Sequence, residues 1–321
     1  MPQENLHKLN DLSAIARIAK RVFPSSSCSI ERVEEGVSTF VYRIIHGRET
    51  FYLRILPEEG QSFAPEIAVH ERLRALGVRV PEIIYFEHCE AQLQRSIMVV
   101  SEIKGKPLSQ SPELNQSEQE SIAREGGRDL ARINSVLVEG FGWIARDDPH
   151  PGSLRGEHQM HSAFALEYWE ADLAFLAEQF LPIDDIERLN LVRTRYASWL
   201  DIPQAHLAHG DLDATHIFQH EGHYSGIIDF GEIRGTSPWY DLGHFSMRDG
   251  ERLPFRLTPA LMHGYADLAP LPASIEQYIC LESLLINVRA LARSLRKRPL
   301  DRYTHHQIMV LNTDLETLLR S

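Results

Sequence analysis

Two aspartates, each directly after a short apolar strand, constrain this chain more than any other feature. Residues 205–230 contain two short apolar stretches separated by polar loops. The sequence HGD, ending at Asp211, follows the first stretch, and DFG, beginning at Asp229, follows the second. Carboxylates in such positions are costly to bury without a partner. A nucleotide-bound metal ion and a substrate hydroxyl would supply partners for both.

The hydrophobic pattern divides the chain into a strand-rich part and a helix-rich part. In the first part we expect strands within 27–56, a helix at 64–77, and strands at 82–87 and 96–103. In the second part we expect helices at 117–137, 160–180, 184–200 and from 255 onward, with two strands within 205–230. The pattern predicts an α+β fold with a small β-rich lobe at 1–103 and a larger α-rich lobe at 104–321. The two lobes would join at a hinge near 101–105.

Composition and charge disfavour several classes of partner. The formal net charge of −12 opposes binding to nucleic acid or anionic membranes and favours cationic ligands. No run of about 18 apolar residues is present, and the first 23 residues are typical of an amphipathic helix rather than a signal peptide. The three cysteines form no C-x-x-C pair, which argues against a disulfide framework or a zinc site. We therefore expect a cytoplasmic protein without a nucleic-acid or membrane partner.

The two aspartate loops resemble motifs of the aminoglycoside and macrolide phosphotransferases. The match consists of H-G-D-L-x-x-x-[N/H] at 209–216 and I-D-F-G at 228–231, with weaker similarity over about 35–245. In protein kinases, the H-R-D-x-x-x-x-N loop takes the place of the first motif. The resemblance implies a bilobal, protein-kinase-like fold and a small-molecule kinase that uses ATP or GTP together with Mg²⁺.

The resemblance also implies roles for the residues of these loops. Asp211 would accept or orient the proton of the acceptor hydroxyl, and Asp229 would bind Mg²⁺ between the β- and γ-phosphates. His216 stands where the family usually has asparagine, although the macrolide phosphotransferases resemble this chain in carrying histidine. We expect it to contact the metal, with a structural hydrogen bond as the alternative because Mg²⁺ prefers oxygen ligands. His209 would position the loop, and Asp241 matches a family aspartate that hydrogen-bonds the loops of the larger lobe.

A lone arginine within an apolar strand indicates an anionic partner. Arg54 lies in the stretch Tyr-Leu-Arg-Ile, where a basic side chain requires a compensating anion. The resemblance matches Arg54 with the family's strand lysine, which reaches the α- and β-phosphates. Its expected ion-pair partner on the helix at 64–77 is Glu66, and Glu71 is the alternative.

Two further segments resemble nucleotide contacts of the family. The hairpin at 35–43 resembles the one that covers the phosphates, where Ser38 and Thr39 would offer hydroxyl and backbone N–H donors. At the hinge, the carbonyl of Ser101 and the N–H of Ile103 would bind the purine edge. Because these hinge contacts come from the backbone, the identity of the side chains there carries little information.

Acidic residues next to the two aspartate loops favour a cationic acceptor. Asp213 lies two residues after Asp211, and Glu232 lies three residues after Asp229. Carboxylates at these places would bind a polycation through charge-assisted hydrogen bonds. The resemblance implies an aminoglycoside or a hygromycin-type aminocyclitol as the acceptor, and antibiotic resistance as the role. A macrolide kinase, a kinase of an endogenous metabolite and a nucleotide-binding pseudokinase are the alternatives.

Overall fold

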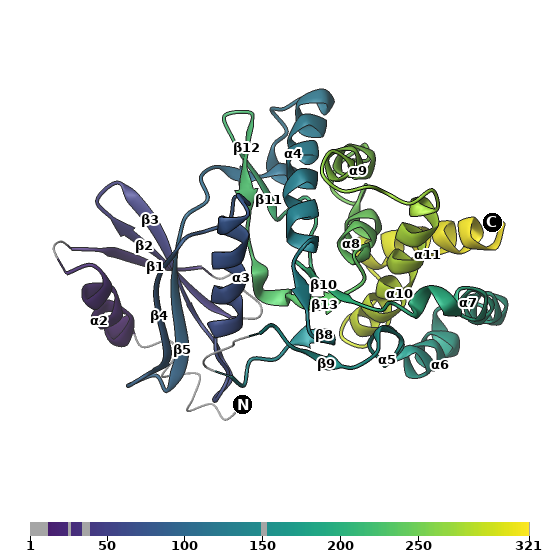
Figure 1. Cartoon of the computed structure of the whole chain (residues 1–321), viewed down its shortest axis with the longest axis horizontal. Coiled ribbons are helices and arrows are strands. Elements are labelled where there is room, and N and C mark those ends of the chain that lie inside the picture. Colours follow the sequence, from purple (N-terminus) through teal and green to yellow (C-terminus); the bar gives the residue numbers. More distant parts are fainter. Residues whose placement is uncertain (1–11, 25–26, 34–38, 149–152, 321) are drawn as a thin grey trace. The chain divides into compact units, whose positions relative to one another are not determined.

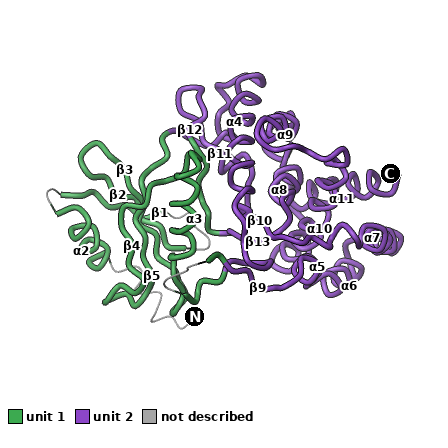
Figure 2. The backbone as a smooth tube through the Cα atoms, viewed as in Figure 1, with its two compact units in different colours: residues 1–104, 145–154, 226–231 green, residues 105–144, 155–225, 232–321 purple. Residues whose placement is uncertain are grey.

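The computed structural model describes residues 12–24, 27–33, 39–148 and 153–320 (Figure 1). The chain divides into two compact units (Figure 2). The first unit comprises 1–104, 145–154 and 226–231, and the second comprises 105–144, 155–225 and 232–321. The sequence-based division placed the two later segments of the first unit in the larger lobe. Backbone hydrogen bonds explain their place, because the N–H of Ser62 donates to Arg146 (2.8 Å) and that of Ile227 donates to Arg79 (2.9 Å).

The first unit is built on an antiparallel five-stranded sheet with the order β1-β2-β3-β5-β4. Its elements are α2 (Leu12–Val22), β1 (Ser29–Val33), β2 (Phe40–His46), β3 (Glu49–Ile55), α3 (Ala64–Ala75), β4 (Ile83–Glu90) and β5 (Arg95–Ser101). Ile15 and Ile18 of α2 pack with Leu53 in one cluster, while Met98 and Phe63 belong to another. The strands and the helix predicted for residues 27–103 are thereby confirmed. The hairpin turn depends on Gly47, whose φ of +64° is costly for other residues.

The second unit is mainly helical and contains short strands. Its helices are α4 (Gln116–Asn134), α5 (His161–Ala165), α6 (Trp169–Gln179), α7 (Ile183–Arg195), α8 (Tyr240–Arg248), α9 (Thr258–Ala266), α10 (Ile275–Leu295) and α11 (Arg302–Arg320). A five-stranded sheet has the order β7 (Leu137–Val138), β10 (Ala205–Ala208), β13 (Arg234–Thr236), β8 (Phe141–Ile144) and β9 (Gly156–His158). A second sheet has the order β12 (His223–Ile227), β11 (Ile217–His220) and β6 (Lys106–Pro107). A large apolar cluster lies among α6, α7, α10 and α11. The predicted α+β class is confirmed.

Three predictions for the second unit were wrong in detail. The helix expected at 160–180 is broken into α5 and α6 between 165 and 169, and the one expected at 184–200 ends at Arg195 and is followed by a 3-10 turn at Ala197–Leu200. Residues 205–230 hold three strands rather than two. Strands β7, β8, β9 and β13 were not predicted, because segments of two to four residues are too short to show an alternating pattern.

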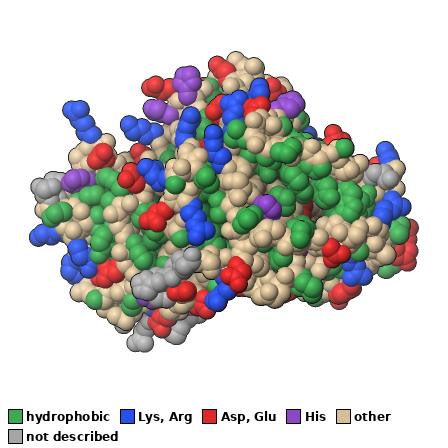
Figure 3. All heavy atoms as spheres, viewed as in Figure 1, with side chains coloured by type: hydrophobic (Ala, Val, Ile, Leu, Met, Phe, Trp, Pro, Cys, Tyr) green, Lys and Arg blue, Asp and Glu red, His purple; other side chains and the backbone are tan. Residues whose placement is uncertain are grey.

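The structure also bears on the composition-based expectations. Among the described residues, no helix has the length and hydropathy required to span a membrane. The three cysteines are free; Cys89 is exposed, and Cys28 and Cys280 are half-buried. On the face drawn in Figure 3, basic side chains are interspersed with acidic ones.

Helices α4 and α9 approach each other closely at two glycines. A Cβ atom on Gly127 would lie 2.0 Å from the carbonyl oxygen of Leu261, and one on Gly264 would lie 1.8 Å from that of Arg124. These distances are far below van der Waals contact, so the helices would have to separate to accept a side chain. The neighbouring Gly126 differs, because its nearest contact is a terminal methyl of Ile217 at 3.2 Å.

We expect Gly127→Ala to destabilise the protein by about 1–3 kcal/mol, the usual cost of overpacking. The matched control is Gly126→Ala, where a flexible side chain can yield and alanine gains roughly 1 kcal/mol of helix propensity over glycine. Urea unfolding followed by circular dichroism measures both. Equal midpoints for the two variants would contradict the inferred backbone contact.

Candidate active site

The loop from 209 to 216, called here the Asp211 loop, leaves β10 through a glycine. Gly210 has a φ of +89°, and a Cβ atom there would lie 1.9 Å from the carbonyl oxygen of Glu232, so that only glycine fits. The carboxylate of Asp241, at the start of α8 and fully buried, accepts the backbone N–H groups of His209 and Gly210, both at 2.9 Å. This carboxylate therefore fixes the backbone immediately before Asp211.

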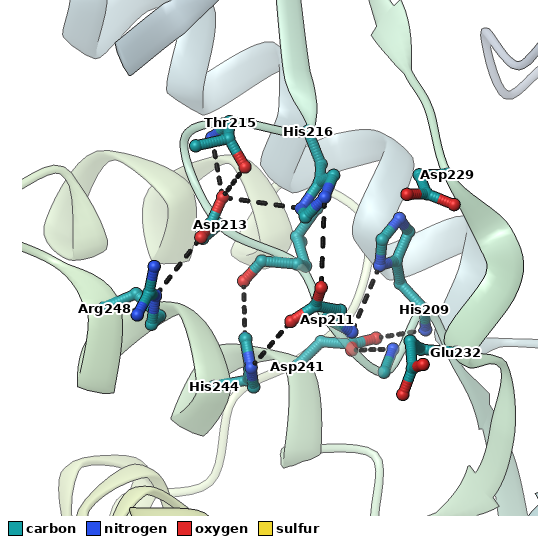
Figure 4. Close-up of polar contacts among 12 residues, drawn as sticks. His209, Asp211, Asp213, Thr215, His216, Asp229, Glu232, Asp241, His244 and Arg248 are labelled. Atoms are coloured by element: carbon teal, nitrogen blue, oxygen red, sulfur yellow. Dashed lines mark hydrogen bonds and ion pairs between the residues drawn. The ribbon is translucent and has the colours of Figure 1, made fainter. Parts of the chain in front are cut away.

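Two histidines face the carboxylate of Asp211 (Figure 4). Oδ1 lies 3.3 Å from Nε2 of His244, and Oδ2 lies 4.0 Å from Nε2 of His216. Burial by itself raises the pKa of Asp211, but the hydrogen bond to His244 and the positive potential of His244, His216 and His209 outweigh it and lower the pKa. Asp211 is consequently a carboxylate at neutral pH, and half of its side chain is exposed.

Asp213 is engaged within its own loop. Its Oδ1 accepts the N–H and the hydroxyl of Thr215 at 2.7 and 2.5 Å and lies 3.4 Å from Nδ1 of His216, while Oδ2 lies 3.3 Å from Nε of Arg248. Burial raises the pKa of Asp213, but His216, Thr215 and Arg248 lower it further than burial raises it. Asp213 therefore stabilises the turn that carries His216.

A cavity of about 770 Å³ opens beside the Asp211 loop within the second unit. It is lined by side chains of α5, α6, α8 and α10, and the predicted site residues Asp211, Asp213, His216 and Glu232 all border it. Arginines also line this cavity, and several are paired with acids. Arg234 lies 3.2 Å from Glu232, and Arg289 lies 3.1 Å from Asp172. The volume suits a drug-sized ligand.

Glu282, on α10, is an acidic residue of this cavity that the sequence analysis missed. Its side chain lines the cavity although only 5% of the residue is exposed. Burial raises the pKa of Glu282 to about 7, and a hydrogen bond from Ser237 partly opposes this. Among the described residues, no arginine, lysine or histidine forms an ion pair with it. Helical periodicity alone cannot distinguish such a carboxyl from an exposed one, so the sequence held no signal for it.

In the first unit, a fully buried carboxylate lies between two arginines. Glu66 on α3 pairs with Arg54 of β3, and its Oε2 lies 3.4 Å from Arg146. Glu71 is exposed, which identifies Glu66 as the ion-pair partner of Arg54. Burial lowers the pKa of Arg54, but Glu66 and Asp229 raise it more, so the guanidinium is charged. Arg146 belongs to no motif and was not predicted.

Asp229 belongs to the same cluster. Its Oδ1 lies 3.4 Å from Arg54, and about half of its side chain is exposed. Its φ of +66° is uncommon for a residue with a side chain, and such backbone conformations are concentrated at functional sites. The guanidinium of Arg146 donates to the carbonyl of Gly231 at 2.9 Å and so anchors the chain just after Asp229.

The remaining predicted nucleotide residues also lie in the first unit. Ser38 is outside the described residues, and Thr39 is half-buried directly before β2. Ser101 ends β5, where its N–H donates to the carbonyl of Glu82 and its hydroxyl accepts the N–H of Glu82, both at 2.9 Å; Ile103 follows. In the described part of the chain, no three His, Cys, Asp or Glu side chains form a complete metal site.

Comparison with known proteins agrees with the resemblance of the motifs. The model of the phosphotransferase enzyme family matches residues 29–278. An aminoglycoside 3'-phosphotransferase from Enterococcus faecalis is 25% identical over 264 residues, which cover 78% of this chain and 91% of that protein. The family match extends over more than half of the chain and includes both aspartate loops.

Solved structures show the same fold at low sequence identity. A thermostable mutant of the aminoglycoside phosphotransferase APH(4)-Ia has a TM-score of 0.68 at 16% identity, with 94% of this chain and 98% of that chain covered. A ternary complex of this enzyme with ADP and hygromycin B has a TM-score of 0.66 at 14% identity and covers 96% and 98%. A structure described as a fructosamine-3-kinase from Thermobifida fusca has a TM-score of 0.63 at 16% identity and covers 96% and 99%.

The fold is therefore that of the kinase-like phosphotransferases, as the sequence predicted. The matched residues 29–278 include both aspartate loops and the residues of the Arg54–Glu66 ion pair. The chain belongs to the phosphotransferase enzyme family, together with the aminoglycoside phosphotransferases.

Proposed function

We propose that this chain transfers the γ-phosphate of ATP or GTP to a hydroxyl of a cationic, aminoglycoside-like compound, with antibiotic resistance as its role. The acceptor would be an aminoglycoside or a hygromycin-type aminocyclitol. The observation that carries the proposal is the Asp211 carboxylate at the wall of a cavity that also holds the buried carboxyl of Glu282. The names of the relatives support it, since one is an aminoglycoside 3'-phosphotransferase and another was crystallised with hygromycin B. The cytoplasm, where ATP and GTP are available, is the proposed compartment.

In this mechanism the acceptor hydroxyl binds to the carboxylate of Asp211. Its oxygen forms a bond to the γ-phosphorus while the bond to the bridging β–γ oxygen breaks, and the hydroxyl proton passes to Asp211. Nucleoside diphosphate is the leaving group. Such transfers depend mainly on positioning the reactants and on neutralising charge. For the acceptor, the principal requirement is therefore a carboxylate held in a fixed position at the cavity.

The nucleotide would be held by residues of the first unit. Arg54 is the proposed contact to the α- and β-phosphates, oriented by Glu66, while Ser38 and Thr39 would cover the phosphates and Ser101 and Ile103 would bind the base. The negative charge of Glu66 keeps Arg54 in place, because one of its guanidinium nitrogens is bound to that carboxylate.

Asp229 and His216 are the proposed ligands of Mg²⁺. A half-exposed carboxylate suits this ion. Nδ1 of His216 is buried without a hydrogen-bond partner in the described structure, although Oδ1 of Asp213 lies 3.4 Å away, so no hydrogen bond of this nitrogen would have to break. When bound, Mg²⁺ would neutralise the charge of the β- and γ-phosphates.

The charges of the cavity bear on the choice of acceptor. Glu282 and Glu232 are the proposed contacts to acceptor amines, together with Asp213 at the loop. The arginines that line the same cavity favour a second candidate, a kinase of an endogenous metabolite. The likeness to a structure described as a fructosamine-3-kinase favours the same candidate. Turnover measured against aminoglycosides, hygromycin B, macrolides and a fructosamine compound decides between these acceptors.

We expect Asp211→Ala to lower kcat by roughly 10²–10⁴-fold and to leave nucleotide affinity near that of the wild type, since the group orients only the acceptor. Asp201→Ala, at an exposed position, is the matched control. Steady-state turnover and nucleotide titration measure the two quantities. Turnover of Asp211→Ala within tenfold of the wild type would contradict the proposed role.

We expect Arg54→Ala to raise the nucleotide KM, because it removes a phosphate contact and leaves the buried Glu66 without one partner. Glu66→Ala should have a similar effect, and the double variant should be no worse than either single one, since the two residues act as a unit. Glu71→Ala is the control and should match the wild type. Additive effects of the two single substitutions would mean that the residues act independently.

We expect Glu282→Gln to raise the KM of an aminoglycoside by about tenfold, as expected for the loss of a hydrogen bond to a charged group. Because the Glu282 carboxyl is neutral below a pKa of about 7 and ionised above it, the wild-type KM should fall between pH 6 and pH 8, while that of Glu282→Gln should stay nearly constant. Glu187→Gln, on the exposed side of α7, is the control. An unchanged KM would exclude Glu282 from acceptor binding.

A further inference from the structure

One face of α8 contacts the Asp211 loop at three successive places. Asp241 accepts the first two N–H groups of the loop. Three residues later, His244 contacts Asp211, and seven residues after Asp241, Arg248 contacts Asp213. Residues spaced three or four apart share one face of a helix. The side chain of Asp211 is therefore held by α8 as well as by its own loop (Figure 4).

The hydrogen bonds of His244 determine where its protons lie. The ring is buried, with 7% of the residue exposed, and Nδ1 lies 3.0 Å from the carbonyl oxygen of Leu212. A carbonyl oxygen only accepts hydrogen bonds, so Nδ1 must carry a proton. Nε2 lies 3.3 Å from Oδ1 of Asp211, a contact that also requires one proton, on either the ring or the carboxyl group.

That second proton lies on the ring, because an imidazole is a stronger base than a carboxylate. Asp211 and Asp213 face it from the loop and, together with the Leu212 carbonyl, raise the pKa of His244 more than burial lowers it. On the same helix, Arg248 is paired with Asp213 and Glu251. The pair is an imidazolium beside a carboxylate, joined by a charge-assisted hydrogen bond.

We propose that His244 is a positioning residue for phosphoryl transfer, whose imidazolium holds Oδ1 of Asp211 so that Oδ2 is presented to the acceptor hydroxyl. The inference rests on the proposed function of Asp211. During transfer the hydroxyl proton moves to Oδ2 while His244 keeps both of its own protons. His244 also borders the cavity, but its role in the transfer is exerted through the orientation of Asp211.

Two substitutions separate this role from a purely structural one. The side-chain amide of asparagine can replace Nδ1 and donate to Leu212, but it does not reach Asp211. The amide of glutamine reaches the position of Nε2 and can donate to Asp211. If His244 only anchors α8 to the loop backbone, His244→Asn should be the milder change; if it positions Asp211, His244→Gln should be.

We expect His244→Asn and His244→Ala to lower kcat by about 10²-fold, the typical effect of a small misplacement of a reacting group, with nucleotide KM within about twofold of the wild type. His244→Gln should restore most of the lost kcat. Turnover is measured with hygromycin B and also as ATP hydrolysis without an acceptor, in which water takes the place of the hydroxyl. If hygromycin B is not an acceptor, it does not raise wild-type turnover, and the comparison of variants is made on hydrolysis alone.

The control is His206→Asn, on β10 just before the loop, where Nδ1 bonds the backbone carbonyl of Asn134 at 2.7 Å. It should leave kcat unchanged. Wild-type kcat in His244→Asn, or a His244→Gln variant as slow as His244→Ala, would overturn the proposal.

A measurement without turnover tests the proposal even if the His244 variants do not fold. In side-chain ¹⁵N spectra of the full chain without Mg²⁺, the signal assigned to His244 should remain that of an imidazolium to a higher pH in the wild type than in Asp211→Asn. Asp201→Asn should leave that signal unchanged. If the His244 signal does not respond to Asp211→Asn, the ion pair is absent and the proposal fails, whatever the acceptor proves to be.

Discussion

The buried carboxylate of Asp241 is the interaction on which the geometry of the second unit depends. It accepts the N–H groups of His209 and Gly210, and no solvent reaches it to replace them. The buried side-chain amide of Asn134 also donates to it, at 3.1 Å. Removing this carboxylate would leave three buried donors without this acceptor, which is costly. Because Asp241 begins α8, the same helix brings His244 and Arg248 to the two aspartates of the loop. The Asp211 loop is thus held by one helix face, and a rigid helix positions a side chain better than a free turn does.

The charge that the cavity offers to a ligand depends on which side chains remain unpaired. Arg234, Arg248 and Arg289 are each bound to a carboxylate of the second unit. Their charges are largely compensated before any ligand binds. Glu282 differs, because it has no basic partner in the described part of the chain and burial raises its pKa to about 7. A ligand amine that reached it would stabilise the ionised form, so the charge state of Glu282 would respond to the acceptor.

In the first unit, two arginines are likewise paired with carboxylates. Glu66 is buried between Arg54 and Arg146. Asp229, 3.4 Å from Arg54, is the second carboxylate of the cluster, so two arginines face two carboxylates. A guanidinium with one nitrogen bound to Glu66 loses little further freedom when it binds an anion, which is the advantage of a preorganised phosphate contact.

The sequence by itself determined the two aspartate loops, the strand-rich and helix-rich parts, and the need of Arg54 for an anion, because each of these follows from local spacing or from burial of charge within one strand. Only the tertiary structure decided between Glu66 and Glu71, since both lie on the same helix and the choice depends on which face packs against the sheet. It also brought His244 to Asp211 and Glu282 to the cavity across 33 and 71 residues of chain. No local pattern marks such residues, because their partners are set by how helices α8 and α10 pack in the second unit.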